Sequence, residues 1–528
     1  MVKGIKTPIT IGLISLALVL AGILGVLVGQ RHTQVTVMTT SLYPITTTVT
    51  HLETPPVMVV ETTVISLTKT STTTLTETVT NVEPLFLQIS SKPILKRIGD
   101  RWILFNVTIR VKPVSGKPAE ALSLVFDGVE RKIEQDGVEV SNVSPGLHRI
   151  VIKGVGWTWE KDLEIGFPDL EPDISYAELV TGGRRTPVTF VAAYYGWYSL
   201  GDLNWHHWGD PENPATKYLP LLAQFSGDPI SQKYSLYGFG LDEGRNLRLV
   251  KRQMVLAKMA GISAFAVSWW GPDSFEDKFM PTILKAAEEV GFKVTVIFEP
   301  FYKNFPDRWR KVEEAINYLE SRYIASNVWL RDTSNLPVVF TFDIGPPEDW
   351  ENWRNILSRR SMAWVAHTTD RRALDYGFKY FYEYSPVGIV AAGGDITQVY
   401  MGVSDIPPYD KQFIPTISPR YDDTKVRAPG IKMGEELWKN SIAATKMVIT
   451  QRRPQFIFVT SWNEWHESTS VEPSTSDGFR LLSEFRKEFY GETLSDEHFL
   501  KTLNVFNCIK FCEIAPHFKR NPCTNINE

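Results

Sequence analysis

The sequence predicts an α/β fold: a (β/α)8 barrel preceded by a small all-β sandwich domain and an N-terminal transmembrane helix. Eight short β-branched and aromatic segments that alternate with segments of helical periodicity indicate the barrel. Strand-like segments with no helical pattern between them indicate the β domain. One long apolar run near the N-terminus indicates the membrane helix.

The first element is a membrane anchor, which we expect over residues 1–30. The run from Ile9 to Val28 is apolar throughout and, at about 20 residues, is long enough to cross a hydrocarbon core of about 30 Å. No small-residue cleavage site follows it, which favours an uncleaved anchor over a removed signal peptide. Lys3 and Lys6 precede it and predict that the N-terminus is cytoplasmic. The predicted location is therefore the cell membrane, in a single pass, with the remaining domains extracellular.

Residues 31–81 follow as a threonine-rich stretch whose composition cannot build a core, and we interpret it as an extracellular stalk. Residues 82–170 then show strand-like runs such as Trp102–Ile109 and His148–Ile152, separated by turn signals. This pattern predicts a β-sandwich of immunoglobulin or fibronectin type. A spacer is its expected role, with a carbohydrate-binding module as the alternative.

The barrel domain is predicted over residues 186–490. Its eight expected strands are Val188–Tyr195, Ile262–Trp269, Lys293–Phe298, Pro337–Phe342, Met362–Ala366, Phe378–Tyr382, Phe413–Ile417 and Phe456–Ser461. Between them, apolar residues recur every three or four positions, as a single buried helix face requires. A doubly wound sheet is the alternative, but no glycine-rich phosphate loop follows the first strand.

The C-terminal tail, residues 491–528, contains all three cysteines: Cys508, Cys512 and Cys523. Their spacing matches no standard zinc site, so we expect one local disulfide and a leftover thiol. We expect no metal and no cofactor. The formal net charge of −4 gives no reason to expect a nucleic-acid partner.

Polar and aromatic side chains gather where the expected strands end. In a barrel these ends share one face, and catalysis takes place there. The residues are Tyr194, Tyr195, Trp197, Tyr198, Ser268, Trp269, Trp270, Glu299, Tyr302, Asp343, Glu383, Tyr384, Arg420, Tyr421, Asp422, Arg427, Glu464 and Glu467. Their positions along the chain predict one cleft.

The richest segment runs from Trp462 to Glu467, directly after the last strand. It contains Glu464 and Glu467 among two indoles, an amide and an imidazole. Cleavage of a glycosidic bond needs two carboxyl groups, and aromatic faces suit sugar rings. The alternative is that these are rim acids and core indoles. The residues alone leave retaining and inverting chemistry open.

A loop after the first strand carries His206, His207 and Trp208, which could close over a ligand. The histidine pair also raises the possibility of a metal site. No third ligand stands at a suitable spacing, which argues against that reading.

Several separated motifs resemble those of family 99 glycoside hydrolases, the endo-α-mannosidase and endo-α-1,2-mannanase family. The resemblance covers about residues 186–489. The motifs occur in the family's order: Tyr195-Gly196-Trp197-Tyr198, His207-Trp208, Ser268-Trp269-Trp270-Gly271, Phe298-Glu299-Pro300, Leu336-Pro337-Val338-Val339, Pro415-Thr416-Ile417-Ser418-Pro419, Tyr421-Asp422-Asp423-Thr424, Val426-Arg427 and Trp462-Asn463-Glu464-Trp465-His466-Glu467.

The resemblance implies a barrel that cleaves within α-mannosides, with retention and without a metal. The acid matching Glu464 would deprotonate the sugar's 2-hydroxyl, which closes a 1,2-anhydro intermediate, and the acid matching Glu467 would protonate the leaving oxygen. The implied partner is an α-mannoside-containing glycan. The expected substrate-binding residues are Tyr195, Trp197, Tyr198, His207, Trp208, Trp269, Trp270, Glu299, Tyr302, Tyr384, Tyr421, Arg427, Asn463 and His466.

The sequence departs from the family pattern at three places. Ser468 stands where a glycine is usual, Asp228-Pro229 replaces His-Pro, and Trp462 replaces a phenylalanine or tyrosine. These changes keep both acids but bear on substrate specificity. Two alternatives remain: a surface protein that binds glycans without cleaving them, and a polysaccharide-synthesis relative of the same barrel. His466 favours the hydrolase, because those relatives usually lack its equivalent.

Overall fold

A computed structural model of the chain divides it into two compact units, Met1–Val82 and Glu83–Glu528. The described residues are 33–37, 45–49, 85–98, 101–113, 122–134, 137–143, 146–154, 157–165, 171–183, 186, 188–198, 209–210, 213–214, 216, 218, 220–222, 229–230, 234–235, 243–405, 411–474, 476–504 and 509–515.

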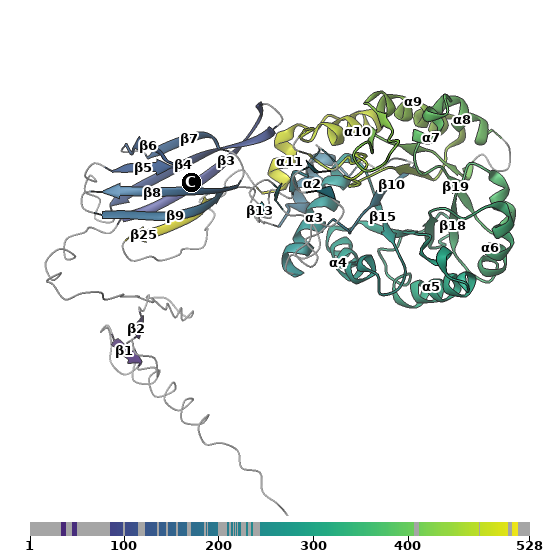
Figure 1. The fold of residues 1–528 in the computed structure, drawn as a ribbon, viewed down its shortest axis with the longest axis horizontal. Coiled ribbons are helices and arrows are strands. Elements are labelled where there is room, and N and C mark those ends of the chain that lie inside the picture. The colour runs from purple at the N-terminus through teal and green to yellow at the C-terminus, as the bar shows by residue number, and fades with distance from the viewer. Residues whose placement is uncertain are drawn as a thin grey trace, which may run out of the picture. The chain divides into compact units, whose positions relative to one another are not determined.

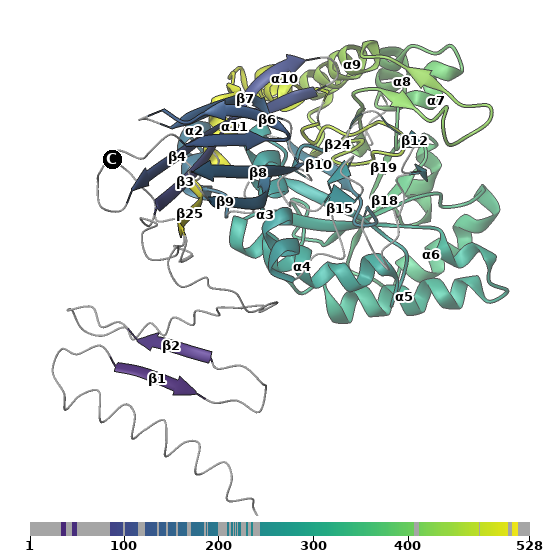
Figure 2. The same cartoon turned by 60° about the vertical axis from the view of Figure 1, so that its left-hand side comes forward.

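In the first unit, β1 (Thr33–Val37) and β2 (Ile45–Val49) form an antiparallel pair (Figure 2). They fall within the stretch interpreted as a stalk. Among the described residues, no helix combines the length and the apolar character that crossing a membrane requires. The run from Ile9 to Val28, on which the predicted anchor depends, lies outside the described residues.

The second unit begins with two small antiparallel sheets of four strands each (Figure 1). One has the order β25-β3-β4-β7 and the other β6-β5-β8-β9. The strands are β3 (Leu85–Ile98), β4 (Arg101–Pro113), β5 (Ser123–Phe126), β6 (Val129–Lys132), β7 (Val138–Val143), β8 (Gly146–Gly154), β9 (Trp157–Ile165) and β25 (Ile509–Ala515). In β5, Leu124 and Phe126 are buried and their neighbours are not, because successive side chains of a strand face opposite sides of the sheet.

The C-terminal tail contains regular secondary structure as well as the cysteines. It contains α11 (Asp496–Thr502) and then β25, which pairs with β3 so that Phe511 lies opposite Ile89. Cys512 lies in β25, whereas Cys508 and Cys523 are outside the described residues, so the expected disulfide stays a prediction. The last strand of the described residues therefore forms an edge of the first sheet.

The larger part of this unit is a barrel-like domain with a nearly closed parallel sheet. Its strands are β10 (Thr189–Tyr194), β15 (Ala264–Trp269), β16 (Lys293–Phe298), β17 (Val338–Thr341), β18 (Ala363–His367), β19 (Tyr380–Tyr382), β20 (Phe413–Ile414), β21 (Thr416–Ile417) and β24 (Phe456–Val459). Each predicted strand segment coincides with one of them to within one residue at its C-terminal end or contains it, with the seventh divided at Pro415, so the predicted strand positions are confirmed.

The divided strand brings the two ends of the sheet together. Its first half, β20, pairs with β19, and its second half, β21, pairs with β24. Pro415 lies between the halves, and its carbonyl accepts a 2.9 Å hydrogen bond from the Phe458 N–H. All neighbouring pairs run parallel, so the carboxyl ends of the strands share one face.

Helices surround the strands (Figure 1). They are α2 (Ile174–Thr181), α3 (Glu243–Ala260), α4 (Phe275–Val290), η3 (Phe301–Asn304), α5 (Arg308–Arg322), η4 (Pro347–Asp349), α6 (Trp350–Leu357), η5 (Arg371–Tyr376), α7 (Val387–Ala391), α8 (Ile396–Val403), α9 (Glu436–Arg452) and α10 (Arg480–Tyr490). In α5 the buried positions are Val312, Ala315, Ile316 and Leu319, the spacing of one helix face.

Two-stranded ribbons connect parts of the barrel domain. They pair β11 (Gly209–Asp210) with β12 (Asn213–Pro214), β13 (Pro229–Ile230) with β14 (Tyr234–Ser235), and β22 (Tyr421–Asp422) with β23 (Lys432–Met433). The third ribbon follows β21 at the carboxyl face of the sheet. It therefore lies in the part of the fold where function is expected.

We expect removal of β25 to expose one edge of β3. A chain ending after Asn504 should lose protection at about half of the backbone amides of residues 85–90, because alternate N–H groups of a strand face each neighbour. Hydrogen–deuterium exchange measures this, with a chain ending after Ala515 as the control. Equal protection in the two truncated chains would contradict the pairing.

Candidate active site

The site begins where β24 ends. Phe456 to Val459 are all buried, and the chain then turns through residues 460–469 at the carboxyl face of the sheet. The turn is attached to the neighbouring strand β10 by a 2.8 Å hydrogen bond from the Trp462 N–H to the Ala193 carbonyl. The Ser461 hydroxyl accepts a 2.6 Å hydrogen bond from the Glu464 N–H. These bonds fix the backbone that carries both candidate acids.

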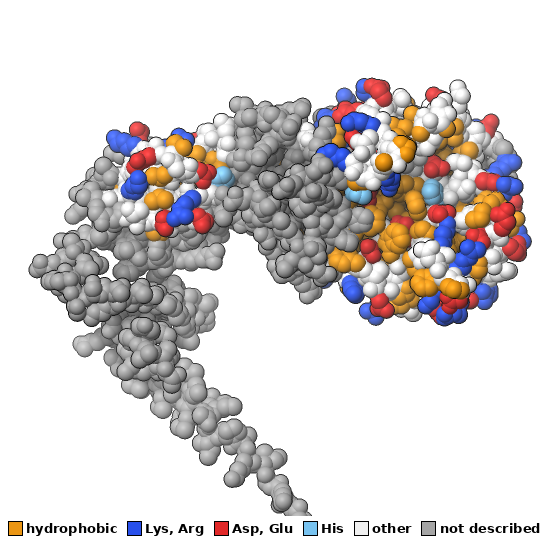
Figure 3. Space-filling model, in the orientation of Figure 1, with side chains coloured by type: hydrophobic (Ala, Val, Ile, Leu, Met, Phe, Trp, Pro, Cys, Tyr) orange, Lys and Arg blue, Asp and Glu red, His pale blue; other side chains and the backbone are white. Residues whose placement is uncertain are grey.

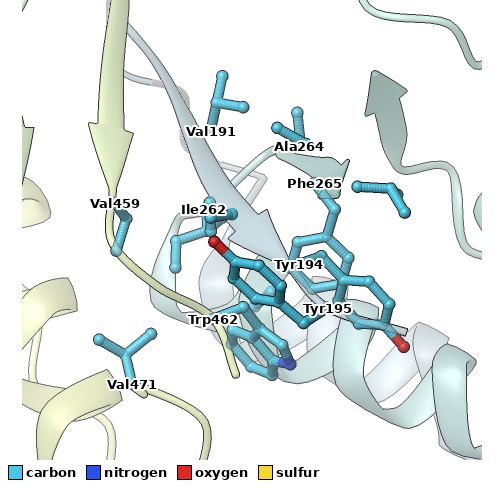
Figure 4. Close-up of a cluster of buried hydrophobic side chains, with 14 of the residues drawn as sticks. Val191, Tyr194, Tyr195, Ile262, Ala264, Phe265, Val459, Trp462 and Val471 are labelled. Carbon is cyan, nitrogen blue, oxygen red and sulfur yellow. The ribbon is translucent and has the colours of Figure 1, made fainter. Parts of the chain in front are cut away.

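Trp462 forms the apolar base of this turn. Its ring is fully buried and lies 5.3 Å from the Phe265 ring, which in turn stacks on Tyr194 at 4.9 Å. Figure 4 shows Trp462 in the hydrophobic cluster that also contains Tyr194 and Phe265. This indole packs in the core, whereas the acids two and five residues later contact Tyr198 and Arg427.

Asn463, one of the expected substrate-binding residues, bonds to the backbone of Tyr195. It is fully buried. Its Oδ1 accepts a 2.8 Å hydrogen bond from the Tyr195 N–H, and its Nδ2 donates a 2.9 Å bond to the Tyr195 carbonyl. Asn463 therefore fixes the backbone of Tyr195 relative to the acid-bearing turn.

Glu464 is nearly enclosed, with 4% of its surface exposed. Its Oε1 accepts hydrogen bonds from the Tyr198 hydroxyl and, at 3.1 Å, from the His466 N–H. Burial, followed by the nearby charge of Glu467, raises the pKa of the Glu464 carboxyl well above its ordinary value. The two hydrogen bonds oppose that rise because they favour the ionised carboxylate.

Glu467 lies on the same turn but has different partners. Its side chain is 17% exposed, and its Oε1 accepts a 2.7 Å ion-pair contact from Arg427 Nη2. Burial raises the pKa of the Glu467 carboxyl, and Arg427 opposes the rise. Because Glu464 and Glu467 influence each other, their protons are lost in steps that belong to the pair. The turn thus holds two carboxyl groups in unlike surroundings.

Tyrosine side chains from two other strand ends lie next to this pair. The hydroxyl groups of Tyr195, after β10, and Tyr384, after β19, contact each other. Trp197 stacks on Tyr195 with ring centres 4.7 Å apart. The charges of Glu464 and Glu467 contribute to the raised pKa of Tyr384, after burial as the larger cause. Both tyrosines therefore stay protonated near the acids.

A third buried acid, Glu299, follows β16. Its Oε1 accepts a 2.8 Å hydrogen bond from the Ser268 hydroxyl, and its exposed fraction is only 5%. Burial raises the pKa of Glu299 to about 8. Tyr195 and Tyr384 both experience the charge of Glu299, which places this acid beside the same cleft. At neutral pH the carboxyl is mainly protonated.

Two expected sugar-binding residues, Trp269 and Tyr302, are buried in this structure. Trp269 is fully buried, and its indole N–H donates a 2.9 Å hydrogen bond to Asp277. Tyr302 is 2% exposed and packs among the rings of Phe298, Trp309 and Trp353. Trp270, by contrast, is 37% exposed, so it presents aromatic surface to solvent.

The ribbon β22–β23 supplies the remaining polar groups. The half-buried Tyr421 donates a 2.9 Å hydrogen bond to Asp423 and accepts a 2.8 Å bond from Arg427.

His466, on the turn after β24, is half-buried, and burial followed by the charge of Arg427 lowers the pKa of its imidazole. The ring is therefore neutral at neutral pH.

His207 and Trp208 lie outside the described residues, as does most of the loop that carries them. Asp423 and Ser461 were not among the predicted site residues, although the Asp423 carboxylate bonds to Arg427 and the Ser461 hydroxyl bonds to the Glu464 N–H. The available signal for Asp423 was its place in the Tyr421-Asp422-Asp423 run. Within the described part of the chain, no group of three His, Cys, Asp or Glu residues could hold a metal ion.

The face of the barrel domain is hollowed in Figure 3, and hydrophobic side chains dominate the hollow, with acidic and histidine side chains among them. Buried acids beside aromatic rings suit the proton transfers and stacking contacts of sugar chemistry. The sequence model of glycosyl hydrolase family 99 matches residues 188–505, more than half of the chain. The chain belongs to glycosyl hydrolase family 99.

Its relatives include the glycoprotein endo-alpha-1,2-mannosidase of Mus musculus, 25% identical to this family 99 chain over 316 residues, 53% of this chain and 67% of the relative. The endo-alpha-1,2-mannosidase-like protein of Homo sapiens is 24% identical over 321 residues, with 53% of this chain and 67% of the relative covered. The solved GH99 endo-alpha-mannosidase of Bacteroides thetaiotaomicron is 17% identical, with a TM-score of 0.45, and the match covers 60% of this chain and 99% of that one.

Replacing Glu299 by Gln should make stability less dependent on pH. The native carboxyl has a pKa of about 8 against an ordinary value of 4.5, so between these pH values the native state binds more protons than the unfolded state. Stability therefore falls as pH rises through this window, by up to about 1.4 kcal/mol per pH unit from this group. Urea unfolding at pH 5 to 8 should show a shallower decline for Glu299→Gln.

The matched control is Glu288→Gln, the same change at an exposed position of α4. It should leave the pH dependence of the free energy of unfolding as it is in the natural chain. If Glu299→Gln retained the full decline, the Glu299 carboxyl would not be the buried titrating group described here.

Proposed function

We propose that this protein is a membrane-anchored, extracellular, retaining endo-α-mannosidase-like hydrolase that acts through a 1,2-anhydro sugar. The observation that carries the catalytic part is the pair of buried carboxyl groups, Glu464 and Glu467, on one turn with unlike partners. Membership of family 99 and the names of the curated relatives support an α-mannoside as substrate. The anchor rests on the apolar run from Ile9 to Val28 alone.

Glu464 is assigned as the base. The Tyr198 hydroxyl and the His466 N–H both donate to its Oε1, so they stabilise the ionised form once Glu467 carries the shared proton. Glu464 then takes the proton of the 2-hydroxyl of the sugar at the cleaved bond. The freed O2 forms a bond to the anomeric carbon as the bond from that carbon to the leaving oxygen breaks.

Glu467 is assigned as the acid and later the base. It gives its proton to the leaving glycosidic oxygen, which departs as a hydroxyl group. The resulting Glu467 carboxylate then takes a proton from water, whose oxygen opens the three-membered ring at the anomeric carbon, and Glu464 returns its proton to O2. Arg427 suits this second role because its ion pair stabilises the carboxylate. Two inversions give net retention.

The remaining residues bind or position the sugar. Tyr195, Tyr384 and the protonated Glu299 carboxyl offer hydroxyl donors from three strand ends, and Trp270 offers an aromatic face. Tyr421, Arg427 and His466 lie on the Glu467 side, where the leaving group would be. His207 and Trp208 keep the role expected of them, closing over the ligand. Asn463, Trp269 and Tyr302 act through packing and backbone position.

Replacing Glu464 or Glu467 by Gln should reduce kcat/KM on an α-1,2-linked mannan by at least about a thousandfold, because each step loses its proton acceptor or donor. New reducing ends released by the detergent-solubilised full chain measure the activity. Glu436→Gln, at an exposed position of α9, is the control and should retain full activity. Circular dichroism should show both catalytic variants to be folded.

Two results would contradict the proposal. Near-natural turnover by both Gln variants would show that these carboxyl groups do not carry the chemistry. Binding of the mannan without any release of reducing ends by the natural chain would favour a glycan-binding surface protein.

A further inference from the structure

Asp423 is a buried carboxylate that organises the loop between β21 and α9. Only 4% of its surface is exposed. Its Oδ1 accepts a 2.6 Å hydrogen bond from the Ile431 N–H, and its Oδ2 accepts 2.9 Å bonds from the Tyr421 hydroxyl and from Arg427 Nη1. Its carbonyl also accepts the Val426 and Arg427 N–H groups, each at 2.9 Å. Both arms of the loop therefore depend on this one side chain.

Arg427 is held between two carboxylates by this arrangement. Nη1 contacts Asp423 at 2.9 Å and the Tyr421 hydroxyl at 2.8 Å, while Nη2 contacts Glu467 at 2.7 Å. A guanidinium group is planar, so contacts on both of its terminal nitrogens fix its place and orientation. Half of the Arg427 side chain is exposed, so these polar contacts rather than burial hold its guanidinium group beside Glu467.

The charges around Glu467 come from three strand ends. Glu464 lies on the same turn, Arg427, Asp423 and Tyr421 come from the loop after β21, and Tyr384 comes from the end of β19. His466 is neutral at neutral pH and lies near Arg427. Arg427 is the cation among these groups. If Arg427 paired with Glu467 alone, its positive charge would keep that carboxyl ionised, and Glu467 could not donate a proton.

We propose that Asp423 is a positioning residue. It pairs with one terminal nitrogen of Arg427 while Glu467 pairs with the other, so that Glu467 can both give and take a proton. The idea rests on the proposed function. Asp423 pairs with Nη1 of Arg427, which leaves Nη2 to pair with Glu467 in the step in which Glu467 is ionised. Its negative charge offsets that of Arg427 in the step in which Glu467 must be protonated. The residue acts through the position of Arg427 and through its own charge near Glu467, and it contacts no reacting atom.

The test compares pH profiles of kcat/KM for Asp423→Asn and Arg427→Gln. Asparagine keeps the shape and one oxygen that can accept from the Ile431 N–H, but it replaces the oxygen that Tyr421 and Arg427 contact by an amide NH2 group and removes the charge. Arg427 then faces a single carboxylate, so the alkaline limb should move to lower pH, by about one unit. Arg427→Gln should move the same limb to higher pH. The double variant should place this limb between those of the two single variants, because it loses both the cation and the anion that offsets it.

Lys432→Gln is the matched control, since it removes a cation from the same ribbon that pairs with Asp422 at 2.9 Å and not with Glu467. It should leave the profile unchanged. The proposal is overturned if Asp423→Asn leaves the alkaline limb in place or moves it in the same direction as Arg427→Gln.

A second measurement does not require activity. Carbodiimide labelling of Glu467, followed over pH by peptide mass spectrometry, reports the protonated fraction of that carboxyl. Relative to the natural chain, the midpoint should be lower in Asp423→Asn and higher in Arg427→Gln. If the natural chain cleaves no α-mannoside, the proposed function fails while this shift still decides the role of Asp423. An unchanged midpoint in Asp423→Asn overturns that role.

Discussion

The structure at the carboxyl face of the barrel-like domain depends on one constraint: two carboxyl groups, three residues apart in the sequence, are both buried. Desolvation and mutual repulsion both disfavour the doubly ionised pair. In the turn after β24 the two acids have different partners. Glu464 accepts hydrogen bonds from the Tyr198 hydroxyl and a backbone N–H, and Glu467 pairs with the Arg427 guanidinium. The two acids therefore differ in proton affinity although one short segment carries both.

The parallel barrel supplies those partners because it brings distant strand ends to one face. Tyr198 follows β10, Tyr384 follows β19 and Arg427 follows β21, so residues more than 260 positions apart meet at the pair, as the bond from Tyr198 to Glu464 shows. Asn463 makes this arrangement rigid by joining the turn to the backbone of Tyr195. Buried hydrogen bonds at the strand ends therefore position the two acids.

The strand positions and the acid-bearing turn could be predicted because their signals are local: β-branched runs, and polar residues directly after them. For Trp269 and Tyr302, local sequence signals could not predict whether the side chain is buried. An aromatic residue at a strand end suits a cleft and a core equally well, and only the packing around Asp277 and Trp353 places these two inside. The pairing of β25 with β3 was beyond reach for a different reason, since it joins segments more than 400 residues apart.

The most direct measurement uses an α-1,2-linked mannoside that lacks only the 2-hydroxyl of the sugar at the cleaved bond. If O2 is the nucleophile and Glu464 its base, this compound should bind the cleft but release no reducing ends, although removing that hydroxyl makes the glycosidic bond intrinsically more labile. Cleavage at a rate comparable to that of the parent mannoside would contradict the account. It would mean that water or a carboxylate of the protein attacks the anomeric carbon directly.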